Sequence, residues 1–93
     1  MATHYIALIH KEDRSGYGIS FPDLPGVTAV ADTLDDALRE AGVALGFALE
    51  DWQGPHPVPR GLDELRADRD FLAWSADAVV AAVAPATGLA DAA

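Results

Sequence analysis

A stripe of apolar residues between positions 34 and 52 constrains the fold of this chain more than any other feature. The stripe starts just after Thr33, which with Asp36 forms a capping-box pattern in which aspartate replaces the usual glutamate. Asp35 and Asp36 fall in the first turn, where the helix dipole favours negative charge. The apolar members recur at three-and-four spacing: Leu34, Ala37, Leu38, Ala41, Leu45, Ala48, Leu49 and Trp52. The pattern predicts one amphipathic helix on a sheet, with the stripe in the core rather than around a cofactor.

Short segments rich in strand-forming residues supply that sheet. Residues 5–9 and 17–21 are predicted as two strands joined by a polar turn over residues 11–16, and residues 27–31 as a third strand. The apolar run at residues 78–84 suits a buried fourth strand, although alanine favours helices and a helix is the competing interpretation. We therefore expect three to four mainly antiparallel strands.

The first predicted strand carries apolar side chains on both of its faces. Tyr5, Ala7 and Ile9 alternate with Ile6 and Leu8, so both faces should be covered. The main helix is one cover, and a second subunit is a candidate for the other. Because a chain of this length buries only about 60 to 65% of its unfolded surface, association would add stability. We expect a homo-oligomer, at least a dimer.

Proline and glycine divide the rest of the chain. The FPDLPG segment at residues 21–26 ends the second strand in a rigid loop, and residues 54–59 stop the main helix and form an extended connector. Residues 62–67 are predicted as a short second helix. For Phe71 and Trp74 a place in the core is favoured over a contact surface, which is the alternative.

Together these segments predict an α+β domain in which the elements follow a β-β-β-α-β order. One main helix and a short second helix pack on the sheet, and the domain occupies residues 1–85. Residues 86–93 have no pattern and are expected to form a disordered tail. Hydrophobic residues make up 51% of the chain and charged residues 23%, so the chain as a whole is too apolar for a disordered segment.

The charge of the chain limits its partners. Fifteen acidic residues against six basic ones give a net charge of −9, which repels nucleic-acid phosphates and anionic lipids and attracts basic proteins. We expect no direct nucleic-acid binding and no membrane contact. The first residues lack the pattern of a signal peptide, and the longest apolar run, residues 78–85, is shorter than the roughly 20 residues that span a bilayer. These features predict a cytoplasmic protein.

The residue types that catalysis or metal binding requires do not occur together in this sequence. There is no cysteine, and His4 and His10 would lie about 20 Å apart along a strand at 3.3 Å per residue, too far to share a metal. His56 lies between prolines without an acid at ligand spacing. No serine has a nucleophile-elbow context and no glycine-rich phosphate loop occurs. We expect no catalytic residues, no metal, no cofactor and no enzyme activity.

The motifs carry a resemblance to a known family. FPDLPG at residues 21–26, the DTLDDA segment at residues 32–37 that opens a helix, and the glycine–tyrosine pair at residues 16–17 resemble the HicB antitoxin family in sequence and spacing. The resemblance covers nearly the whole chain. One departure is Ala31, where the family often has glycine.

The resemblance implies a partly degenerate RNase H-like fold that binds and neutralises a small basic HicA-type toxin, an mRNA-cleaving protein. The first strand lacks the carboxylates of a two-metal nuclease, so we expect the fold without its chemistry. Members of the family usually continue into a helix-turn-helix or ribbon-helix-helix domain that binds DNA. Only eight residues follow Pro85, which puts DNA repression in doubt.

The candidate partner-binding residues form two groups. The first lies around the FPDLPG loop and the helix start, where acids meet a basic partner and two aromatic residues add apolar contact: Asp23, Asp32, Asp35, Asp36, Tyr17 and Phe21. The second is Val43 and Phe47, one turn apart on the helix face opposite the stripe. The connector or the second helix folding over this pair is the alternative.

A function of another class remains open from the sequence. The chain would then be a solitary homo-oligomeric module, structural or ligand-binding, without a toxin partner. A neighbouring gene for a small basic protein favours the antitoxin, and its absence favours this alternative.

Overall fold

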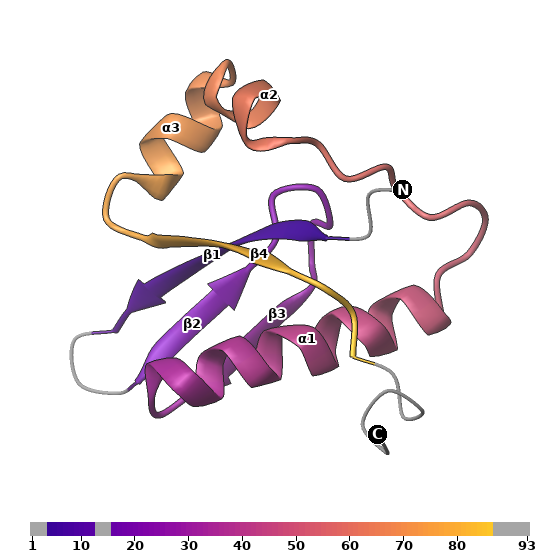
Figure 1. Cartoon of the computed structure of the whole chain (residues 1–93), viewed down its shortest axis with the longest axis horizontal. Helices are drawn as coiled ribbons and strands as arrows, with labels where there is room; N and C mark the ends of the chain where they lie inside the picture. The colour runs from indigo at the N-terminus through magenta and orange to yellow at the C-terminus, as the bar shows by residue number, and fades with distance from the viewer. Residues whose placement is uncertain (1–3, 13–15, 87–93) are drawn as a thin grey trace.

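The computed structural model describes residues 4–12 and 16–86 and forms a four-stranded antiparallel sheet with helices on both faces (Figure 1). The strands lie in the order β3-β2-β1-β4. In chain order the elements are β1 (Tyr5–Lys11), β2 (Tyr17–Ser20), β3 (Thr28–Ala31), α1 (Leu34–Glu50), α2 (Leu62–Arg66), α3 (Arg69–Ser75) and β4 (Val79–Val83). The α+β class and the fourth strand are thus confirmed. The predicted turn at residues 11–16 falls partly outside the described residues.

Helix α1 begins where its capping signal predicted. The Thr33 hydroxyl oxygen accepts a hydrogen bond from the Asp36 backbone N–H at 3.1 Å, and this bond satisfies one of the free donors of the first turn. Helix α3 was not predicted. The Asp68 carboxylate caps it by accepting from the backbone N–H groups of Asp70 and Phe71, at 2.8 Å and 3.4 Å.

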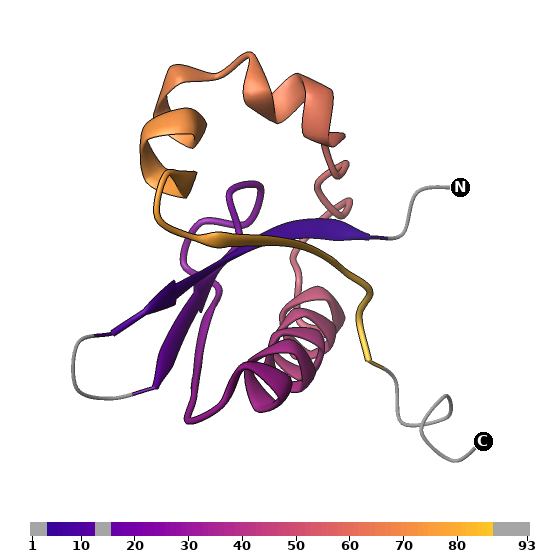
Figure 2. The same ribbon diagram turned by 60° about the vertical axis from the view of Figure 1, so that its left-hand side comes forward.

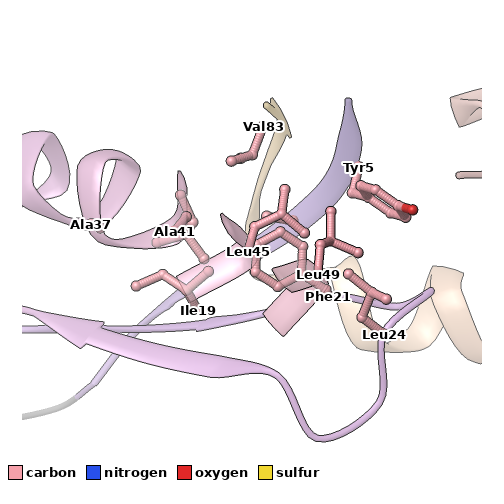
Figure 3. Close-up of a cluster of buried hydrophobic side chains, with 11 residues drawn as sticks. Tyr5, Ile19, Phe21, Leu24, Ala37, Ala41, Leu45, Leu49 and Val83 are labelled. Atoms are coloured by element: carbon pink, nitrogen blue, oxygen red, sulfur yellow. The ribbon is translucent and has the colours of Figure 1, made fainter. Parts of the chain in front are cut away.

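The main core lies between α1 and the face of the sheet that we call the inner face (Figure 3). From α1 it takes Ala37, Ala41, Leu45 and Leu49, and from the strands and the FPDLPG loop it takes Tyr5, Ala7, Ile9, Ile19, Phe21, Leu24 and Val83. Alternate side chains of β1 and β2 therefore point into the core, as the sequence pattern predicted.

The buried side of α1 differs from the predicted stripe at two places. Leu34 and Leu38 are exposed, whereas Gly42 and Gly46 are buried. The chain that leaves β4 crosses α1 at these two glycines, and the Ala86 N–H donates to the Gly42 carbonyl oxygen at 3.0 Å. The chain after β4 therefore covers α1 only beyond its first two turns. Leu34 and Leu38 lie in those two turns and stay exposed. Residues 87–93 of the predicted tail lie outside the described residues.

The other face of the sheet, the outer face, is covered by α2 and α3 (Figure 2). Leu8 of β1 is fully buried there with Leu65 of α2 and Phe71 of α3. Both faces of β1 are therefore covered within one chain, and a second subunit is not the cover that we expected. Phe71 is in the core as predicted, but the expectation for Trp74 is wrong because 45% of this residue is exposed.

Candidate partner-binding surface

Asp23, expected to present charge to a partner, is held inside the molecule. Its carboxylate accepts from the Arg60 backbone N–H at 2.7 Å and from the Arg60 Nε at 2.6 Å, and only 9% of its side chain is exposed. Arg60 also lies 3.5 Å from an Asp68 carboxylate oxygen. Because Arg60 pairs with its charge, Asp23 joins the connector to the FPDLPG loop and is not a free contact residue.

The hydroxyl of Tyr5 makes a second bond to the same connector. It donates to the Pro57 carbonyl oxygen, and burial, followed by the nearby charge of Asp23, raises the pKa of Tyr5 above its usual value. These contacts, together with the Arg60 pair, hold the connector against the start of β1.

Phe21 also lies away from any surface. Only 1% of it is exposed, and it packs with Leu24 and Leu45 in the main core, as Figure 3 shows. The expected apolar contact at Phe21 is therefore wrong, because its position before the loop directs it inward.

Several acids border an open cavity at the start of α1, which we call the acidic hollow. Its volume is about 590 Å³. The hollow is lined by Glu12, Gly16, Tyr17, Val30, Ala31, Asp32, Asp36, Arg39 and Glu40. Four of these residues are acidic and one, Arg39, is basic and pairs with Asp36. An excess of negative charge thus borders the cavity.

The structure brings three of the predicted contact residues together at the hollow: Tyr17, Asp32 and Asp36. Asp35 is exposed in the first turn of α1 but does not line the acidic hollow. Glu12 and Glu40 line the hollow and were not predicted. Glu40 lies one turn after Asp36, a spacing that places both on one side of the helix and was readable from the sequence.

Tyr17 forms part of the wall of the hollow. The Lys11 ammonium lies 5.6 Å from the centroid of its ring, within the range of a cation–π contact. Gly16 is required beside it, because a Cβ at this position would lie 1.8 Å from the Ala31 carbonyl oxygen. A half-buried aromatic face that already holds one cation is suited to basic side chains.

The side of α1 that carries Asp36 and Glu40 continues into the predicted apolar pair. Val43 and Phe47 follow at spacings of three and four residues, so the four side chains form one row along the helix. Val43 is half-buried and 66% of Phe47 is exposed. Helices α2 and α3 lie across the sheet from α1 (Figure 2), so the alternative that the second helix covers Phe47 is wrong.

Neither a metal site nor a spanning helix was found in the part of the chain that the structure describes. Among residues 4–12 and 16–86, no group of three or more histidine, cysteine, aspartate or glutamate residues is arranged to hold a metal ion. Within the same residues, no helix has the length and hydropathy to cross a membrane.

Comparison with known proteins identifies a family and similar solved structures. The family model for the HicB-like antitoxin of a bacterial toxin–antitoxin system matches residues 5–89. The crystal structure of the Burkholderia pseudomallei antitoxin HicB is 28% identical with a TM-score of 0.66, over 89% of this chain and 63% of that one. The crystal structure of the N-terminal domain of that antitoxin is 26% identical with a TM-score of 0.65, over 90% of this chain and 99% of that one. No curated protein matches.

The chain therefore spans less than two thirds of the full B. pseudomallei antitoxin and nearly all of its N-terminal domain.

Proposed function

The chain belongs to the HicB-like antitoxin family of bacterial toxin–antitoxin systems, and on this premise we propose that it binds and neutralises a small basic HicA-type toxin that cleaves mRNA. The observation that carries this proposal is the acidic hollow, together with the row of side chains that runs from it along α1. Toxins that bind RNA need basic residues for its phosphates, and carboxylates at matching positions compete for the same residues.

The acidic end of this surface would guide and orient the toxin. Asp32, Asp36 and Glu40 border a concave site, where charges act together on an approaching basic protein and raise its association rate. Tyr17 adds an aromatic face for a lysine or arginine of the toxin. Such attraction falls as salt is added, since the Debye length is about 8 Å at physiological ionic strength.

The apolar end would supply the anchor. An exposed phenylalanine at the end of an acidic row provides area that is removed from water on binding, which charges at the rim do not provide. Phe47 is therefore the residue of this surface that we expect to contribute most to residence time, while the acids mainly set the rate of encounter.

Further properties are part of the same proposal. We propose that the protein is cytoplasmic, acts by stoichiometric contact and not by catalysis, and binds no nucleic acid directly. The net charge of −9 supports the last point, because it opposes contact with phosphates. We also propose that the chain self-associates, at least as a dimer.

Co-expression with the adjacent gene for a small basic protein tests the proposal. The two proteins should purify together, and the purified chain should stop mRNA cleavage when it equals the toxin in amount. A toxin that binds neither the parent chain nor any variant contradicts the antitoxin function. The solitary oligomeric module, without a toxin partner, would then replace it.

A further inference from the structure

Strand β4 leaves one side of its backbone without a partner strand. It is the last strand in the order β3-β2-β1-β4, and within residues 4–12 and 16–86 its only strand partner is β1. Among the described residues, no hydrogen bond reaches the side of β4 that faces away from β1. Figure 1 shows β4 crossing in front of β1. An edge of this kind is a template for another strand.

The sequence of β4 lacks the features that usually prevent such pairing. The strand reads VVAAV, with no charge and no proline, and the structure shows it as one regular five-residue strand. Val79 and Val80, which point to opposite faces, are 46% and 39% exposed. Natural edge strands are commonly protected by lysine, proline or a bulge, so an uncharged, exposed edge indicates a binding partner.

The other edge of the sheet is less suited to a second copy. Strand β3 borders the acidic hollow, because Val30 and Ala31 line it next to Asp32 and Asp36. Two copies that paired through β3 would bring two acidic hollows together, and each chain carries a net charge of −9. The nearest acid in sequence to β4 is Asp77, which precedes the strand. Charge therefore favours β3 and α1 for a basic partner and β4 for a like-charged copy.

The face alternation of β4 allows one register that uses the whole strand. Val79, Ala81 and Val83 pair with core residues of β1 and lie on the inner face, while Val80 and Ala82 lie on the outer face. Opposite residues in an antiparallel pair point to the same face, so a two-fold axis must pass at a residue. With the axis at Ala81, Val79 opposes Val83 and Val80 opposes Ala82 of the other copy.

We propose that β4 pairs antiparallel with β4 of a second copy, with Ala81 facing Ala81 across the two-fold axis. Two four-stranded sheets then form one continuous sheet. This surface is separate from the acidic hollow and goes beyond the proposed toxin binding, because a dimer of this kind leaves α1 free. It also gives self-association a location that the covered faces of β1 do not provide.

Cross-linking through a single cysteine tests the register. The chain contains no cysteine, so Ala81→Cys can form a disulfide only between copies. Residues directly opposite in an antiparallel pair lie about 4.5 to 5.5 Å apart, within the range of a disulfide. Ala29→Cys is the matched control, since Ala29 is also a half-buried, inner-face alanine of an edge strand. Mild oxidation should give covalent dimers for Ala81→Cys and far fewer for Ala29→Cys.

Placing a lysine on the β4 edge or on the β3 edge of the sheet tests the same surface without cross-linking. Val80→Lys should weaken the dimer about tenfold or more, whereas Val30→Lys, at a more exposed position on β3, should leave it unchanged. Sedimentation measures the dimer, and circular dichroism checks the folding of both variants. Added salt should not weaken the dimer, because like-charged copies repel less when screened.

The proposal is overturned if the parent chain is a monomer at micromolar concentration, or if both cysteine variants cross-link equally. It is also overturned if only Val30→Lys dissociates the dimer, which assigns the contact to β3. None of these measurements involves a toxin, so their outcome is independent of the proposed antitoxin function.

Discussion

Arg60 binds Asp23 twice, through its backbone N–H at 2.7 Å and its Nε at 2.6 Å, across 37 positions of sequence. This contact joins the connector after α1 to the FPDLPG loop after β2. The connector leads to α2 and α3, which cover the outer face of the sheet (Figure 2). The pair therefore helps to position both helices, which is a role in the fold.

Asp23→Ala should lower the free energy of unfolding by about 1.5 to 3 kcal/mol, because it removes hydrogen bonds between charged partners at a mostly buried carboxylate. Urea denaturation measures the effect. Asp77→Ala, at an exposed acid, is the control and should change the free energy by less than about 0.5 kcal/mol. Equal effects of the two substitutions would contradict the structural role of Asp23.

Asp68 links stability to pH. Hydrogen bonds from the N–H groups of Asp70 and Phe71, and then the contact with Arg60, hold the pKa of the Asp68 carboxyl below its usual value. A pKa that is lower in the folded state adds stability above the unfolded value of about 3.9, and this stability is lost as pH falls through the folded pKa. Acidification below about pH 4 should therefore destabilise the parent.

Asp68→Asn removes this titration while keeping a side chain that caps helices well. Its free energy of unfolding should fall less than that of the parent between neutral and acid pH, as measured by denaturation at each pH. Asp63→Asn, at an exposed acid of α2, is the comparison and should behave as the parent. An identical fall for Asp68→Asn and the parent would show that Asp68 does not contribute.

The sequence predicted those parts of the fold whose signals are local. The start of α1 follows from the cap at Thr33, and the inner core follows from strand alternation and helix periodicity. Helix α3 was missed although Asp68 is a recognisable cap, because this residue comes directly after the predicted helix at residues 62–67. Asp68 can mark the end of the predicted helix as well as the start of the next one, and the sequence alone does not separate the two.

Contacts between distant segments were not predictable from pattern alone. From the sequence, Asp23 was expected to be an unpaired surface carboxylate, because no neighbouring residue indicates that Arg60 reaches it. The two apolar faces of β1 indicated a second cover but not its source, which proved to be Leu65 and Phe71 of the same chain. Three lining residues of the acidic hollow, Tyr17, Asp32 and Asp36, had been named as contact residues from the sequence, whereas Glu12 reaches the hollow only through the pairing of β1 with β2.

The chain after β4 crosses α1 at Gly42 and Gly46, so replacing Gly46 with alanine should change the stability in an unusual direction. In a helix interior, replacing glycine with alanine usually stabilises by about 0.5 to 1 kcal/mol. A Cβ at Gly46 would lie 2.3 Å from the Ala86 carbonyl oxygen, so Gly46→Ala should instead destabilise by about 1 to 3 kcal/mol. Thermal or urea unfolding measures this change.

Gly42→Ala is the matched comparison for the crossing. Its Cβ would lie 3.2 Å from the Ala84 carbonyl oxygen, a contact that a small shift relieves, so this variant should be more stable than Gly46→Ala. The reverse order would mean that the chain after β4 does not pack on α1 as described.

Substitution of Phe47 should affect toxin binding but not the stability of the fold. Because 66% of it is exposed, Phe47→Ala should change the free energy of unfolding by less than about 0.5 kcal/mol, yet weaken toxin binding by about tenfold or more. Val58→Ala, at an even more exposed apolar residue on the connector, should affect neither. Calorimetric titration with the toxin and urea unfolding measure the two quantities. Equal affinities for the two variants would remove Phe47 from the contact surface.

The most direct test of the account is the affinity of the toxin for chains that lack acids at one place or another. Asp32→Asn with Glu40→Gln removes two charges from the acidic hollow, and Asp63→Asn with Asp77→Asn removes two exposed charges elsewhere. Calorimetric titration of the basic toxin at physiological salt should show binding at least about tenfold weaker for the first double variant and nearly parental binding for the second. Equal loss in both would contradict a defined site at the hollow and leave only diffuse attraction between opposite charges.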